Sequence, residues 1–146
     1  MADGDGYYSN PESLSLYLPS SLPPKIRQCL ELKEIREAEQ RLCEAQANNA
    51  LAEVHRLHRV IQGLWQFKKI NVSGTGNRAN TRMLDSYSQF QTKLHRAAHH
   101  YHVAYTALVA LDPDGQWKEQ LKELKPLDIR EPGRDPDNPN DAKSNG

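Results

Sequence analysis

The chain has 146 residues, of which 37% are hydrophobic and 26% are charged, and its 19 basic residues balance its 19 acidic ones. This length suits one domain with a modest core. The zero net charge excludes a chain-wide attraction to nucleic acid or to an anionic membrane surface, although local charged patches remain open. No apolar run approaches the ~20 residues that cross a bilayer, so we expect no membrane partner.

Cysteine spacing and the N-terminal composition predict where the protein works. Cys29 and Cys43 would lie roughly 21 Å apart on one straight helix, far beyond the ~7 Å between Cα atoms that a disulfide allows. The segment that follows Met1 is acidic and polar, and it lacks the charged and then apolar pattern of a secretory signal. Both observations predict a reduced, intracellular protein.

Residues 1–24 predict an extended leader, because prolines interrupt any helix that begins there. These prolines are Pro11, Pro19, Pro23 and Pro24. The leader is also richer in apolar side chains than a linker needs to be. We expect it to lie across the helices and to bury Leu14, Leu16, Tyr17, Leu18 and Leu22.

Residues 25–71 predict the first arm of a helical hairpin, since they contain no proline, one glycine and mostly helix-forming residues. Apolar residues recur there at steps of three and four, as on one face of an amphipathic helix. That face consists of Leu42, Ala45, Ala47, Ala50, Val54, Leu57, Ile61 and Leu64, widened by Trp65 and Phe67. A break is expected near Asn48 and Asn49, because asparagine is a weak helix former.

Residues 81–111 predict the second arm, after a turn around Gly74 and Gly76. Two series of residues spaced by seven form the two seams of a coiled-coil-like face. They are Tyr87, Leu94, Tyr101 and Leu108, and Met83, Phe90, Ala97, Ala104 and Leu111. Residues 116–125 predict a short third helix, which Pro126 stops, and the polar residues 131–146 predict a disordered tail.

The predicted fold is therefore all-α, with a long antiparallel helical hairpin in a helical domain of residues 25–130. Two helices alone cannot cover each other's apolar faces, so two hairpins are expected to pair into a homodimer. The predicted core or interface residues are Leu57, Ile61, Leu64, Trp65, Tyr87, Phe90, Leu94, Tyr101 and Leu108.

A series of motifs in fixed order carries a family resemblance over about residues 14–130. The motifs are Leu-Pro-Ser-Ser-Leu at 18–22, the segments 39–54, 67–76 and 101–111, Asn80-Thr-Arg, Trp117, and Asp128-Ile-Arg. The series resembles the C-terminal helical region of the Kyakuja-Dileera-Zisupton (KDZ) transposases, which are abundant in mushroom-forming fungi. Their acidic catalytic residues lie in an upstream RNase H-like core that nothing in this chain matches. The resemblance implies a non-catalytic transposase tail, a nuclear location and a transposase as partner.

The region between His55 and Leu84 is basic, since it contains six lysines and arginines and no aspartate or glutamate. Positive side chains and the backbone amides of a glycine turn can bind phosphate. A solvated hairpin tip is the first interpretation of this region, and a contact of the tip with a nucleic-acid backbone is the functional hypothesis beside it. The residues of this candidate site are Arg59, Lys68, Lys69, Arg78 and Arg82.

Other candidate chemistry is weaker. The histidines at 55 and 58, and at 95, 99 and 102, have a spacing that could seat zinc, but their places beside the apolar seams favour surface histidines. The turn around Gly74 lacks the lysine of a P-loop, and the glutamates of residues 31–44 alternate with basic residues as on an exposed helix face. We predict no cofactor, no metal and no catalytic residue.

The expected function is thus a helical interaction module that associates with itself or with a partner. A nucleic-acid-binding accessory that uses the basic tip is the second expectation. A third is a transposase remnant without a function.

Overall fold

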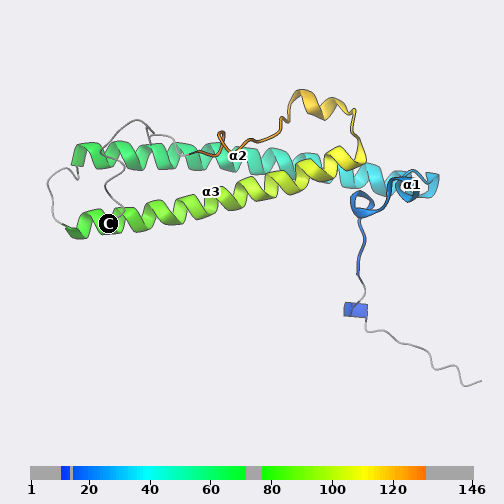
Figure 1. The fold of residues 1–146 in the computed structure, drawn as a ribbon, viewed down its shortest axis with the longest axis horizontal. Helices are drawn as coiled ribbons and strands as arrows, with labels where there is room; N and C mark the ends of the chain where they lie inside the picture. The colour runs from blue at the N-terminus through cyan, green and yellow to red at the C-terminus, as the bar shows by residue number, and fades with distance from the viewer. Residues whose placement is uncertain (1–10, 14, 72–76, 131–146) are drawn as a thin grey trace, which may run out of the picture.

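The computed structural model describes residues 11–13, 15–71 and 77–130. Across these ranges the secondary structure is helical and contains no strand. The helices are α1 (Pro24–Arg27), α2 (Lys33–Asn71) and α3 (Asn77–Leu111), joined by the 3₁₀ turns η1 (Pro11–Ser13), η2 (Pro19–Ser21), η3 (Leu30–Leu32) and η4 (Gln116–Glu119). Figure 1 shows α2 and α3 side by side and antiparallel, which confirms the predicted all-α hairpin.

The first arm is interrupted at a different place from the one predicted. α2 runs without a break through Asn48, whose side chain donates a hydrogen bond of 2.9 Å to the Glu44 carbonyl on the preceding turn. The break near the asparagines was therefore a wrong prediction. The helix is interrupted instead between Arg27 and η3, where the Arg36 guanidinium donates to the Arg27 carbonyl at 3.1 Å. This bond satisfies a carbonyl that has no helical donor.

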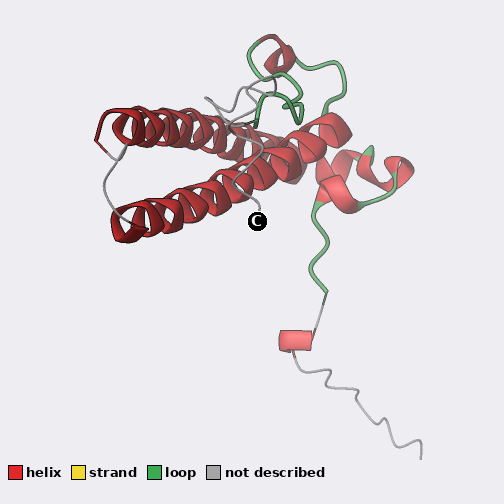
Figure 2. Ribbon diagram, turned by 60° about the vertical axis from the view of Figure 1, so that its left-hand side comes forward, coloured by secondary structure: helices red, strands yellow, loops and turns green. Residues whose placement is uncertain are grey.

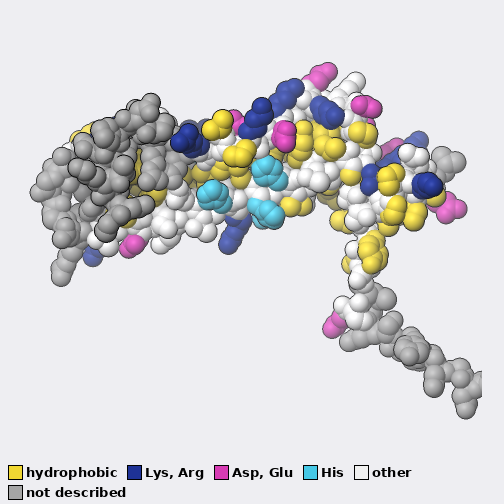
Figure 3. Space-filling view, viewed as in Figure 1, with side chains coloured by type: hydrophobic (Ala, Val, Ile, Leu, Met, Phe, Trp, Pro, Cys, Tyr) yellow, Lys and Arg dark blue, Asp and Glu magenta, His cyan; other side chains and the backbone are white. Residues whose placement is uncertain are grey.

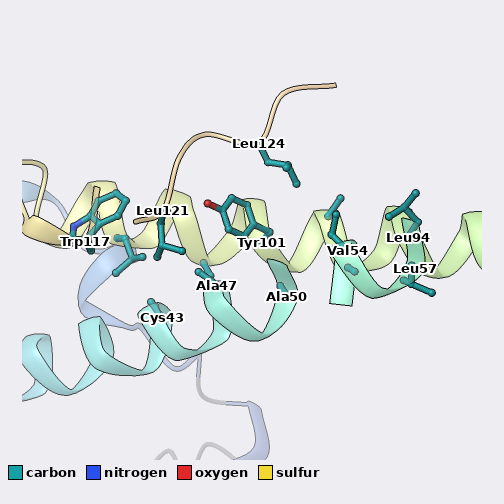
Figure 4. Close-up of a cluster of buried hydrophobic side chains, with 14 of the residues drawn as sticks. Cys43, Ala47, Ala50, Val54, Leu57, Leu94, Tyr101, Trp117, Leu121 and Leu124 are labelled. Atoms are coloured by element: carbon teal, nitrogen blue, oxygen red, sulfur yellow. The ribbon is translucent and has the colours of Figure 1, made fainter. Parts of the chain in front are cut away.

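The core is a layer of small and branched side chains between α2 and α3, shown in Figure 4. Ala47 and Ala104 are almost fully buried and let the two backbones approach closely. Of the expected core or interface residues, Leu57, Ile61, Leu94, Tyr101 and Leu108 are buried, and Leu64, Trp65, Tyr87 and Phe90 are half-buried.

The N-terminal end of the predicted apolar face was wrong by one position. Leu42 and Ala45 are exposed, whereas Cys43 is buried. Cys43, Ala47, Ala50 and the residues that follow at steps of four and three form the buried row. Helical phase therefore selects the smaller cysteine over the neighbouring leucine, because Leu42 lies about 100° further round α2.

Residues 116–130, here called the strap, pack on the hairpin without forming the predicted helix at 116–125. Only η4 at its start is helical, although Trp117, Leu121 and Leu124 are all buried. The Tyr101 hydroxyl donates to the Lys122 carbonyl at 2.5 Å and so ties this non-helical part of the strap to α3. Gly115 permits the tight start of the strap, because a side chain there would collide with the Trp117 ring.

The predicted burial of the leader was wrong for most of its apolar residues. Leu16 is 95% exposed and Tyr17 is 71% exposed, and Leu18 is exposed as well. Residues 15–18, here called the arm, leave the helical body as an extended strip (Figures 1 and 2). Among the leader residues whose burial is described, which are 12, 13 and 15–24, only Pro19 is buried.

Some sequence predictions lie outside the described residues. These are the disordered tail at 131–146, the turn at 72–76 and the burial of Leu14. Among the helices that are described, none is long and apolar enough to span a membrane.

Candidate interaction surfaces

A polar anchor holds η2 against the hairpin. Glu39 on α2 is only 6% exposed, and no other charged side chain of the described residues is buried to that degree. Ser20 satisfies both of its carboxylate oxygens, through a backbone N–H at 3.0 Å and a hydroxyl at 2.5 Å. The buried carboxylate thus gains the two charge-assisted hydrogen bonds that offset its loss of water.

Arg27 completes this anchor from the end of α1. Its guanidinium donates to the carbonyls of Pro19 at 3.1 Å, Ser20 at 3.1 Å and Leu22 at 2.7 Å. It also donates to the carbonyl of Ala110 near the end of α3. One side chain therefore ties the leader turn to a residue of α3 that is 83 positions further along the sequence.

A groove of about 540 Å³ lies between α2 and α3. Ala50 and Ala97 are its buried lining, whereas Gln46, Asn49, His100 and Val103 line it as exposed residues. We call this site the groove.

The groove and the strap lie on opposite flanks of the hairpin. Gln40 donates to Asp112, just before the strap, at 3.2 Å, and therefore marks the strap flank of α2. At about 100° per residue, Gln46 and Glu53 project about 120–140° away from Gln40. Glu39, Gln46 and Glu53 are spaced by seven, so η2 and the groove share the second flank.

The basic tip is built from the end of α2 and the start of α3, which meet at one end of the hairpin (Figure 1). Trp65 and Tyr87 pack edge to face there, with ring centroids 5.1 Å apart. The Lys68 ammonium stands 4.9 Å from the centre of the Trp65 ring, which holds this charge in a cation–π contact.

The other predicted residues of the tip are exposed wherever their side chains are described. Lys69 and Arg82 are exposed on either side of the tip, and Arg59 is exposed about two turns before it. Arg78 lies in the first turn of α3, and its side chain falls outside the described residues. Lys68 and Lys69 also complement the negative end of the α2 dipole, so their position by itself carries a structural role.

The histidines and cysteines form no chemical centre in the part of the chain that is described. No group of three or more metal-binding side chains occurs there, and His95 and His99 are exposed. Both cysteines are free thiols. Burial, with a smaller contribution from Glu39, raises the pKa of the Cys43 thiol, which keeps it protonated and unreactive near neutral pH.

The sequence predicted neither the anchor nor the groove. Ser20, Arg27 and Glu39 look like ordinary turn and helix-surface residues, and their contacts join segments far apart in the chain. The Leu-Pro-Ser-Ser-Leu motif was the one available signal, since proline followed by serines favours a tight turn.

Comparison with known protein families, curated proteins and solved structures finds no match to this chain.

Proposed function

We propose that the protein is a non-catalytic helical interaction module that associates with a second copy of itself. The observation that carries this proposal is the unequal cover of the hairpin. The strap covers one flank with Trp117, Leu121 and Leu124, whereas the groove flank carries apolar side chains that face solvent. Those exposed side chains are Ile35, Leu42 and Val103.

Exposed apolar area supports association, because its removal from water contributes roughly 25 cal/mol per Å². Single exposed leucines are common on monomers, but a run of them beside an open groove is typical of an interaction surface. The resemblance to the C-terminal region of KDZ transposases also favours a role in assembly, with a transposase as the second type of partner. No catalytic step is part of the proposal.

The proposal predicts that the full chain forms a dimer. Light scattering coupled to gel filtration, at about 1 to about 100 µM protein, is expected to give a mass near twice the 16.6 kDa of one chain at the upper end. The substitution Leu127→Ser, at an exposed site on the strap, is the control and should leave the mass unchanged. A mass of one chain at every concentration would contradict self-association.

A second function, binding of DNA, is favoured by the exposed positive charges of Lys69 and Arg82 on either side of the tip. The first turn of α3 contains no acidic residue that would oppose a phosphate. A contact of this kind uses charge rather than base readout, so it is independent of sequence and sensitive to salt.

The double variant Lys69→Glu and Arg82→Glu is therefore expected to weaken binding to duplex DNA by at least about tenfold at low salt. Gel-shift titrations at about 50 and about 200 mM salt measure the affinity and its salt dependence. A matched reversal, Lys25→Glu with Arg41→Glu, changes two exposed charges at the opposite end of the hairpin. Equal losses for both doubles, or no shift by the unmodified protein, would rule out a tip-specific site.

A further inference from the structure

The arm is an exposed apolar strip, and the groove is an open hollow with a small apolar floor and a mostly polar rim. We propose that the arm of each copy docks into the groove of a second copy, so that reciprocal exchange of arms forms the dimer. This inference rests on the proposed self-association and names the surface and the occupant that produce it. The occupant is an extended apolar segment, residues 15–18 of the neighbouring chain.

The arm has the form and chemistry of a bound peptide. Ser15–Leu18 form no helix or turn, and the side chains of Leu16 and Tyr17 are among the most exposed apolar groups described in the chain. Leu18 is exposed beside them, and three neighbouring exposed apolar side chains form a patch, which is more informative than a single exposed leucine. Figure 3 shows the strip of apolar side chains standing away from the helical body.

The groove matches the arm in size, and its floor is apolar inside a polar rim that includes His99 and the Glu53 carboxylate, which is paired with Arg56. Its length from Gln46 to Glu53 is about 10 Å at 1.5 Å per residue, and four extended residues span about 13 Å. The small side chains of Ala50 and Ala97 leave a volume of about 540 Å³, and a benzene ring occupies a cavity of only ~150 Å³. The side chains of Leu16 and Leu18, which point to the same side of an extended segment, therefore fit together.

The rim of the groove offers partners for an extended backbone. Gln46 and Asn49 carry carboxamides, each with donors and an acceptor, which can pair with the N–H and C=O groups of a peptide. Extended segments that lack their own hydrogen bonds are commonly bound through such groups, while alternate side chains enter the pocket. The His100 imidazole and the Val103 side chain complete the opposite wall.

The direction of the arm favours a neighbouring copy over the chain's own groove. The Leu18 carbonyl accepts from both the Ser21 N–H, at 2.9 Å, and the Ser21 hydroxyl, at 2.7 Å. Arg27 holds the next carbonyl, that of Pro19. These bonds fix the turn from which the arm leaves, and both ribbon views show it directed away from α2 and α3 (Figures 1 and 2).

Two-fold symmetry makes the exchange reciprocal. The anchor at Glu39 and the groove lie on the same flank of α2, so each arm starts beside the groove of its own chain. Two copies that face each other through this flank therefore place each arm over the other copy's groove. Such an isologous contact uses one surface twice and closes at a dimer.

The test combines an arm variant with a groove variant. Leu16→Ser with Leu18→Ser removes the two apolar side chains of the arm that face the groove, and Val103→Asp places a charge in the groove at a residue that is 56% exposed. Each variant alone is expected to weaken the dimer by at least about tenfold. Circular dichroism checks that both remain helical, and Leu127→Ser on the strap is the control.

An equal mixture of the two variants is the decisive sample. A mixed dimer retains one intact contact, between the arm of the groove variant and the groove of the arm variant. Native mass spectrometry separates the three dimers by mass, and the mixed dimer is expected to exceed either parent dimer by about tenfold in abundance.

The other results overturn the exchange, and they separate it from the proposed function. A dimer that survives both variants leaves self-association standing and excludes the arm as its cause. Two monomeric variants that do not recover on mixing indicate that the arm folds into the groove of its own chain. A monomer of the unmodified protein defeats both proposals.

Discussion

Replacing Tyr101 with alanine is expected to lower the free energy of unfolding by about 3–5 kcal/mol, the range found for large aromatic side chains in cores. Tyr101 is 1% exposed, and its ring stacks on Tyr105 with centroids 6.0 Å apart. Burial, and to a lesser degree Tyr105, raises the pKa of the Tyr101 hydroxyl, so the group stays protonated and donates to the Lys122 carbonyl. Urea unfolding followed by circular dichroism measures the change.

The variant Tyr101→Phe separates the contribution of the buried ring from that of the hydroxyl hydrogen bond. It keeps the ring and removes only the hydrogen bond, so a smaller loss of about 1–2 kcal/mol is expected. Hydrogen exchange should rise in the strap more than in α2, because the lost bond joins α3 to Lys122. A loss below about 1 kcal/mol for Tyr101→Ala would show that this ring is not central to the core.

Replacing Arg27 with alanine is the second change with a large expected effect. It leaves the carbonyls of Pro19, Ser20, Leu22 and Ala110 without their guanidinium donor. Bonds to a charged donor contribute about 1.5–3 kcal/mol each in favourable cases, but the carbonyls near the surface can turn to water. We therefore expect a local loss of about 2–4 kcal/mol, confined to the leader and α1.

Hydrogen exchange of residues 19–28, compared with residues 50–60, measures that local loss. Arg27→Lys is expected to resemble the alanine variant, because an ammonium cannot reproduce the planar fork that reaches several carbonyls. Arg41→Ala, at an exposed position of α2, is the control and should leave exchange unchanged. Full protection of residues 19–28 in Arg27→Ala would contradict the anchoring role.

Features that depend on helical period were predictable from sequence. The seven-residue series of α3 places Leu94, Tyr101 and Leu108 on one face, and all three are buried. The antiparallel order also follows from two long helices joined by a short glycine-containing turn. The same period, applied across the first arm, failed at both ends, where Cys43 is buried in place of Leu42 and where Phe67 is 56% exposed.

Features that depend on contacts between distant segments could not be predicted. The strap packs on the hairpin without being helical, and the bond that ties it to α3 joins Tyr101 to Lys122, 21 positions apart in the sequence. The anchor joins Ser20 to Glu39 and Arg27 to Ala110, pairings that no local pattern specifies. The predicted hairpin was enough to bring the end of α2 and the start of α3 together at the basic tip. The groove could not be predicted, because it depends on which flank of the hairpin the strap leaves uncovered.

The unbroken course of α2 sets a distance and an angle between its two ends. Its 39 residues extend over about 58 Å, with the arm's anchor at one end and the basic tip at the other. A continuous helix has no joint at which the two ends could turn independently. One residue inserted near Asn48 would rotate the tip by about 100° relative to the anchor and advance it by about 1.5 Å. Seven inserted residues would restore nearly the original facing, so α2 acts as a spacer that holds orientation as well as length.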